Sequence, residues 1–173
     1  VDIKNQYKDC LLFFRLGDFY ELFFEDAEIA SRELEITLTG RDCGFDERAP
    51  MCGVPWHSAH NYIARLINRG YKAAICEQVE DPALAKGIVK REVIRVITPG
   101  TVTDPLMLEE KKNNFIMSVY CSKSYFGVSA ADVTTGEFYA TQIILGNTLK
   151  KLVDEISRYK PSEIVINSEF EKA

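Results

Sequence analysis

The sequence predicts an α/β fold in two parts: a mixed-sheet domain with flanking helices, followed by a second α/β domain that is cut part-way. Short apolar runs typical of strands alternate with stretches in which apolar residues recur every three or four positions, as in helices. Prolines, a glycine and a charged run interrupt this pattern between residues 99 and 114. We therefore expect a first domain at 1–104, a linker at 105–113 and part of a second domain at 114–173.

The first elements follow from apolar spacing. Residues 11–16 form a short apolar run that ends at Gly17, as in a buried strand. Asp18 suits the N-cap of a helix, and an apolar stripe with helical spacing follows it. The stripe consists of Tyr20, Phe23, Phe24, Ala27, Ala30 and Leu34. Residues 36–39 predict a second strand, and a polar loop follows at 41–50.

The remaining elements are expected in the order helix, two strands, linker, three strands, helix, strand. Ser58 caps the helix of the first domain, and Gly70 ends it. The strands are expected at 71–76 and 90–98 and, after the linker, at 115–121, 125–132 and 136–144. The short connections between the last three favour antiparallel hairpins. A helix at 147–159 and a strand at 163–166 complete the series.

The composition is that of a soluble globular protein, with 46% hydrophobic and 27% charged residues. The net charge of -5 argues against tight nucleic-acid binding by this chain alone, although basic residues outnumber acidic ones at 58–100. Five cysteines without a C-x-x-C pair indicate buried thiols and a reducing compartment, the cytoplasm. No run is long and apolar enough for a membrane span.

Several motifs stand in a recognisable order along the chain. They are RLGDFYELF at 15–23, PMCGVPWH at 50–57, AICEQ at 74–78 followed by Asp81-Pro82, and TPGT at 98–101. Together they resemble the N-terminal part of the MutS family of DNA mismatch-repair proteins. The DVTTGE segment at 132–137 is similar to the opening strands of the family's connector domain. The resemblance implies a mismatch-recognition domain followed by a truncated, RNase H-like α/β connector domain.

The resemblance also implies a mechanism and a set of DNA contacts. In the family, the Phe of a Phe-x-Glu motif stacks on a mispaired base from the minor groove and the Glu hydrogen-bonds that base. Those positions are Phe19 and Glu21 in this sequence. Arg41, Met51 and Arg91 match positions expected near the DNA backbone or groove.

This mechanism is physically reasonable. A side chain wedged between base pairs unstacks them and bends the duplex, at a cost of roughly a few kcal/mol. A mismatch has already lost some pairing, so the same deformation costs less there. An ionised carboxylate is repelled by phosphates and finds no disturbed base in matched duplex. Glu21 therefore penalises matched DNA as well as rewarding a mismatch.

Other interpretations of the same residues remain open. Phe19 lies beside an apolar stripe and could belong to the core. Asp18 and Glu21 have the spacing of a capping box at a helix start. On a helix, residues i and i+2 lie about 200° apart, so Phe19 and Glu21 can both face DNA only if the helix starts at or after Tyr20 or presents its N-terminus end-on. Arg41 and Arg91 could be ordinary surface charges, and Met51 could be core packing.

A metal site or an enzyme is not expected. Zinc is the alternative for a Cys and His group whose spacing fits no finger pattern: Cys43, Cys52, His57 and His60. An RNase H-like nuclease could use Asp132 as a metal ligand, but two-metal chemistry needs several convergent carboxylates. Asp132 has only Glu137 close to it in sequence. We expect no catalytic residue, no metal and no cofactor in this chain.

By resemblance, the intact protein is a homodimeric clamp with a distant ATPase that uses ATP and magnesium. Its partners are mismatched double-stranded DNA and downstream repair proteins. The alternative function is an interaction module that relays signals within a repair complex without touching the mismatch.

Overall fold

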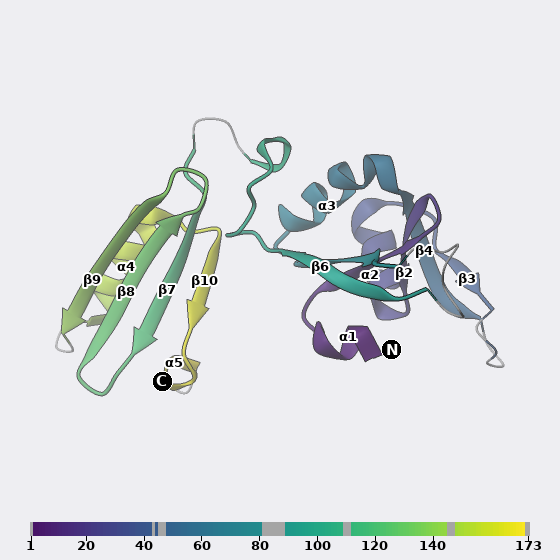
Figure 1. Cartoon of the computed structure of the whole chain (residues 1–173). Coiled ribbons are helices and arrows are strands. Elements are labelled where there is room, and N and C mark those ends of the chain that lie inside the picture. Colours follow the sequence, from purple (N-terminus) through teal and green to yellow (C-terminus); the bar gives the residue numbers. More distant parts are fainter. Residues whose placement is uncertain are drawn as a thin grey trace. The chain divides into compact units, whose positions relative to one another are not determined.

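The structure is a computed structural model that describes residues 2–42, 44, 48–80, 89–108, 112–144 and 148–171. The chain forms two compact units, Val1–Thr98 and Pro99–Ala173, each with its own sheet (Figure 1). Both sheets are mixed and both units carry helices, so the predicted α/β class is confirmed. The units divide at Thr98 and Pro99, and the expected linker lies within the second unit.

The first unit contains a sheet in the order β3-β4-β2-β1-β5-β6. Strands β1 and β5 are parallel, and the other described pairs are antiparallel. Its elements are α1 (Asp2–Gln6), β1 (Leu11–Leu16), β2 (Phe19–Phe23), α2 (Glu25–Leu34), β3 (Thr39–Arg41), β4 (Ala49–Pro55), the 3₁₀ turn η1 (Trp56–Ser58), α3 (Ala59–Ile67), β5 (Ala73–Gln78) and β6 (Arg91–Ile97).

The helix predicted to begin at Asp18 is wrong in its first turns, because it begins only at Glu25. A two-residue turn with Gly17 first leads from β1 directly into β2. Gly17 has a φ of 57°, which glycine adopts without strain. Strand β2 is paired on both sides, by β1 and by β4, and its aromatic residues suit a strand. Phe24, with a φ of 54°, separates the strand from the helix.

The capping-box interpretation of Glu21 is also wrong. Glu21 lies in the middle of β2, and the N-cap of α2 is Phe24, which makes no side-chain capping hydrogen bond. The later part of the predicted stripe does face the core, because Ala27, Ala30 and Leu34 are buried in α2. The apolar spacing was therefore correct for the helix and misleading for the strand before it.

Helices α2 and α3 contact each other, and both pack on β4 (Figure 1). The strand residues buried on the side of the helices alternate along the chain with residues on the other side. They include Leu11, Phe13, Tyr20, Leu22, Cys52 and Val54. The intervening residues of β2 and β4 form a second, less covered face.

The polar loop predicted at 41–50 was too long, and the strand predicted at 36–39 was misplaced. Strand β3 begins only at Thr39, and residues from Ala49 onward belong to the seven-residue strand β4. Glycine and proline inside β4 weaken its sequence signal, whereas pairing with β2 and β3 stabilises it. The Asp81-Pro82 pair and the charged residues 109–111 lie outside the described part of the chain.

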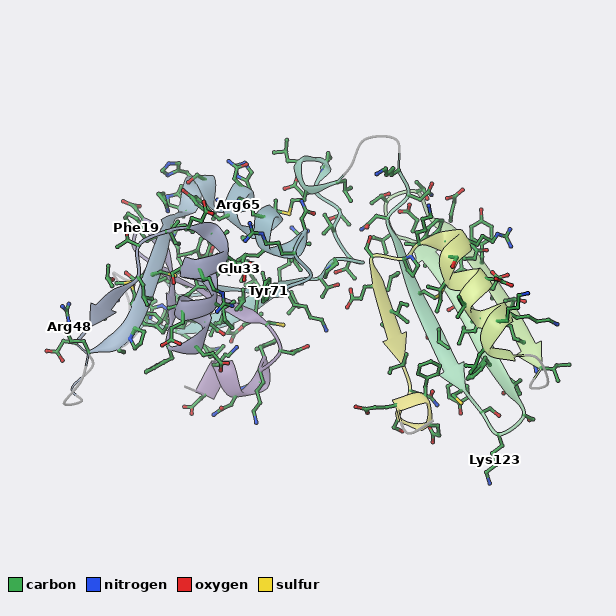
Figure 2. The ribbon with its side chains drawn as sticks, turned by 180° about the vertical axis from the view of Figure 1, so that it is seen from behind. Phe19, Glu33, Arg48, Arg65, Tyr71 and Lys123 are labelled. Carbon is green, nitrogen blue, oxygen red and sulfur yellow. The ribbon has the colours of Figure 1, made fainter. Side chains whose placement is uncertain are left out.

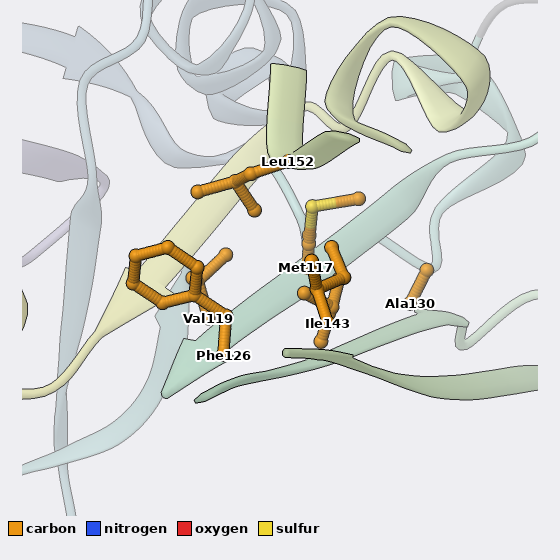
Figure 3. Packing of buried hydrophobic residues seen from close by; sticks show 7 residues of the cluster. Met117, Val119, Phe126, Ala130, Ile143 and Leu152 are labelled. Atoms are coloured by element: carbon orange, nitrogen blue, oxygen red, sulfur yellow. The ribbon is translucent and has the colours of Figure 1, made fainter. Parts of the chain in front are cut away.

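The second unit contains a sheet in the order β10-β7-β8-β9. Strands β10 and β7 are parallel, and the hairpins β7–β8 and β8–β9 are antiparallel, as predicted. Its elements are the 3₁₀ turn η2 (Pro105–Met107), β7 (Phe115–Cys121), β8 (Tyr125–Asp132), β9 (Glu137–Ile144), α4 (Thr148–Tyr159), β10 (Glu163–Ile166) and α5 (Ser168–Glu171). Leu152 of α4 packs against apolar strand residues that include Met117, Phe126 and Ile143 (Figure 3).

Within the described residues, no helix has both the length and the apolar character that a membrane span requires.

Candidate nucleic-acid interface

The less covered face of the first sheet brings Phe19 and Glu21 together. A strand directs residues i and i+2 to the same side, so Phe19, Glu21 and Phe23 share this face of β2. In the register with β4, Glu21 lies opposite Gly53 and Phe23 lies opposite Met51. The geometric conflict of a helical Phe-x-Glu motif therefore does not arise.

Phe19 is a surface residue of the first unit (Figure 2). Its side chain is 46% exposed, whereas its neighbours Tyr20 and Leu22 are buried. Phe19 pairs with Leu16 of β1 and with Pro55 of β4 at the start of β2. The interpretation of Phe19 as a core residue is wrong, and the ring is available to a ligand.

Arg15 and Trp56 stabilise the turn that precedes Phe19. The Arg15 guanidinium lies 4.6 Å from the centroid of the Trp56 ring, and Arg15 Nε donates a hydrogen bond to the carbonyl of Gly17 at 2.6 Å. The Trp56 amide donates to the carbonyl of Asp18 at 3.0 Å. These contacts connect the hairpin tip to η1 and restrict the backbone just before Phe19.

Glu21 forms an ion pair with Arg41, which reaches it from the edge strand β3. The Arg41 guanidinium also lies 5.9 Å from the centroid of the Phe23 ring. Gly53 lies beside both side chains: a Cβ built there would make ordinary van der Waals contacts, 3.6 Å from Glu21 Cγ and 3.7 Å from Phe19 Cδ1. The position of the Glu21 carboxylate is thus defined by three neighbouring strands.

A shallow, open depression of about 550 Å³ lies beside these residues. Three of its lining residues, Phe19, Glu21 and Met51, are residues that the sequence analysis selected. The other lining residues are Glu35, Ile36, Thr37, Thr39 and Gly53. Met51 is half-buried and lines this surface, so it is not a core residue.

Arg91 lies on the same face but at the other side of the sheet, on β6. Its guanidinium lies 5.2 Å from the centroid of the Phe14 ring, and Phe14 pairs with Glu21 across β1 and β2. Arg91 Nε donates to the carbonyl of Arg15 at 3.2 Å. Arg91 therefore lies on the same face as Glu21 but is not among the residues that line the depression beside Phe19.

A partly buried hydrogen bond anchors β2 on the helix-covered side. The Tyr20 hydroxyl donates to the carboxylate of Glu77, which belongs to the AICEQ motif on β5. Burial, together with this hydrogen bond, raises the pKa of Tyr20 to about 12. Tyr20 is therefore a neutral donor at physiological pH, and it connects two motifs that are distant in sequence.

The metal alternatives find no support among the described residues. No group of three or more His, Cys, Asp or Glu side chains there could hold an ion, and Cys43 lies outside them. Burial raises the pKa of the Cys52 thiol to about 11, which disfavours the thiolate that zinc requires.

Asp132 of the second unit has a structural environment. It is buried, and its carboxylate accepts hydrogen bonds from the amides of Asn114 and Thr134 at 2.9 and 2.8 Å. The Thr134 hydroxyl donates to it as well, at 2.6 Å. These bonds organise the β8–β9 turn and the chain before β7.

The sequence analysis did not assign a role to Arg15, Gly53, Trp56 or Glu77, although all four lie within the quoted motifs. The two-residue period of residues 19–23, with Tyr20 and Leu22 apolar and Glu21 polar, was the available signal for a strand. The helical spacing of the residues after it concealed that signal.

Comparison with known proteins agrees with the two-unit structure. Residues 1–105 match the family MutS domain I, and residues 114–173 match the family MutS domain II. The chain is 70% identical over 170 residues to the DNA mismatch repair protein MutS of Acetivibrio thermocellus and 71% identical over 170 residues to that of Ruminiclostridium cellulolyticum. Each alignment covers 98% of this chain and 20% of the relative, so the chain spans about a fifth of their length.

Proposed function

Because the chain belongs to the MutS family, we propose that its first unit recognises mismatched or unpaired bases in double-stranded DNA and so initiates mismatch repair. The single observation that carries the proposal is the exposed Phe19 ring beside Glu21 on one face of β2. Phe19 enters the duplex as the wedge, and Glu21 hydrogen-bonds the disturbed base.

The exposure of Phe19 supports the role of a wedge. An apolar ring at the tip of a fastened hairpin can enter a base stack without any rearrangement of the core. The rigid turn keeps the ring in place before DNA arrives, so little conformational freedom is lost on binding. Stacking of one base on an aromatic side chain contributes about 1–3 kcal/mol.

The neighbouring residues support a groove-facing surface. Met51 and Thr39 line the depression beside Phe19, while Arg41 and Arg91 place positive charge on the same face. Cationic side chains at such positions hold the phosphate backbone without reading sequence. Specificity then comes from the lower cost of deforming DNA at a mismatch.

The remaining functions of the whole protein lie outside this chain. The net charge of -5 gives the chain little non-specific affinity for DNA, so the rest of the protein supplies most of the binding energy. We assign the dimeric clamp and the ATPase, with its ATP and magnesium, to that remainder. This chain itself has no catalytic role. The protein works in the cytoplasm, with downstream repair proteins as its partners.

The deciding experiment uses the full-length protein that contains this chain. Binding of mismatched and matched duplexes is titrated for the unmodified protein and for Phe19→Ala. We expect Phe19→Ala to lose the preference for mismatched DNA, with a reduction of about 10- to 100-fold from the loss of stacking. The matched control is Phe24→Ala, because Phe24 is 48% exposed but lies after β2.

Phe24→Ala should keep the mismatch preference. If Phe19→Ala keeps it as well, direct mismatch contact by this unit is excluded, and an interaction module within a repair complex becomes the better assignment.

A further inference from the structure

Arg41 and Glu21 differ in how much of each is exposed to solvent. The Glu21 side chain is 18% exposed, whereas that of Arg41 is 44% exposed. The carboxylate is thus the covered member of the ion pair, and the guanidinium is the member that faces outward. A guanidinium has five N–H donors, so one that binds a carboxylate still presents others to solvent.

The pair extends across the sheet. Arg41 belongs to the edge strand β3, β4 lies between, and Glu21 belongs to β2. Gly53 of β4 is paired with Glu21 in the sheet register and lies in contact distance of its side chain. Phe23 lies beside the guanidinium, and its ring offers a surface along which Arg41 can move without losing its apolar contact.

The pairing affects how DNA meets this face. While the pair is closed, the charges of Arg41 and Glu21 cancel, and the carboxylate repels phosphates only weakly. A half-exposed ion pair is also weakly stabilising, so a phosphate can replace the carboxylate as the partner of Arg41. Replacement releases Glu21, which then needs a partner of its own.

From this geometry we propose that Arg41 and Glu21 act as a counter-ion switch that opens only at a mismatch. On matched duplex the pair stays closed, because a released Glu21 would have no partner. At a mismatch, Arg41 moves to a backbone phosphate and Glu21 turns to the disturbed base beside Phe19. Arg41 is therefore a positioning residue that couples phosphate contact to base contact. The inference rests on the proposed mismatch contact of Phe19 and Glu21.

The test is the salt dependence of DNA binding by the full-length protein. Each phosphate contact contributes about 0.9 to the slope of log binding constant against log salt concentration. Arg41→Gln should reduce the slope for mismatched duplex by about 0.9 and leave the slope for matched duplex unchanged. In a Glu21→Gln background Arg41 is always released, so Arg41→Gln should reduce both slopes.

Two variants serve as controls. Arg48→Gln removes the same charge from the residue next to Ala49, which pairs with Arg41. Its effect on the slope should be the same for both duplexes and in both backgrounds. Arg41→Lys keeps the charge and should retain the slopes. If thermal melts show that the glutamine variant is misfolded, Arg41→Met, which also removes the charge, replaces it with the same expected slopes.

Equal slope changes on matched and mismatched duplex for Arg41→Gln would mean that Arg41 always contacts phosphate, and the switch would be refuted. If Arg41→Gln changes the slope on neither duplex, the ion pair between Arg41 and Glu21 never opens. No change on matched duplex in the Glu21→Gln background would show that Glu21 does not restrain Arg41. The proposed function fails separately, if Phe19→Ala keeps the mismatch preference.

Discussion

Phe19 and Glu21 project from the same face of β2, with Gly53 of the neighbouring strand beside both of them. This relationship depends on the backbone of residues 19–23 being a strand, because a helix would direct the two side chains about 200° apart. The buried residues between them, Tyr20 and Leu22, face the helices. The predictions for Leu22, Glu21 and Tyr20 depend on that alternation or on the contacts that it creates.

Leu22→Ala should destabilise the first unit strongly, whereas Phe19→Ala should not. Leu22 is fully buried, and truncating a buried leucine costs about 2–5 kcal/mol of unfolding free energy. The change at Phe19 should be within about 0.5 kcal/mol, as for other surface substitutions. Urea unfolding can be followed by the fluorescence of Trp56, the single tryptophan, which lies in this unit. Comparable destabilisation by both substitutions would contradict the assignment of residues 19–23 to a strand.

Glu21→Gln should bind matched duplex more tightly and so reduce the ratio of mismatched to matched affinity. Glutamine removes the negative charge but keeps a hydrogen-bond donor and nearly the same shape. Unfolding free energy should change by less than about 1 kcal/mol in both Glu21→Gln and Glu21→Ala, because the lost ion pair is half-exposed. Duplex titrations of the full-length protein and thermal melts measure the two effects. Unaltered discrimination by both variants would leave Phe19 as the only probe of the mismatch.

Tyr20→Phe should remove part of the alkaline destabilisation of the first unit. Burial and the hydrogen bond to Glu77 raise the pKa of Tyr20 from 10 to about 12 in the folded state. The protonated Tyr20 hydroxyl therefore contributes fully to the free energy of unfolding below about pH 10. Its contribution declines as the pH rises towards 12, because the unfolded chain releases the proton first. Urea unfolding at about pH 9 and about pH 11 should show a smaller decline for the variant. Identical declines would mean that Tyr20 does not titrate in this range.

Asp132→Asn should destabilise the second unit by about 1–3 kcal/mol near neutral pH. Burial tends to raise the pKa of Asp132, but hydrogen bonds from Thr134, Asn114 and Thr135 outweigh it and hold the pKa below 3.8. The stabilisation is present above pH 3.8 and is lost as the pH falls through the folded pKa. Thermal melts followed by circular dichroism, from neutral to acidic pH, should therefore converge for the two proteins.

The matched control for that experiment is Glu137→Gln, because Glu137 is exposed at the start of β9. It should leave the stability of the second unit nearly unchanged. A loss at Glu137 as large as that at Asp132 would argue against the special role of the buried carboxylate.

The sequence by itself determined the α/β class, the hairpins of the second unit and the family. Strands β7 and β8 were predicted with their observed bounds, because alternating residues between short turns carry a clear local signal. The motifs that carry the family resemblance are also local, since each is a contiguous run of residues. Local patterns of this kind require no knowledge of which segments meet in space.

Only the tertiary structure decided the geometry around Phe19 and Glu21. Residues 19–23 form a strand because β1 and β4 pair with them, and β4 is contributed by residues beyond the next helix. The partner of Glu21 comes from β3, and the partner of Tyr20 comes from β5. Strand pairing and ion pairing join residues that are distant in sequence, so the spacing of apolar residues along the chain could not reveal them.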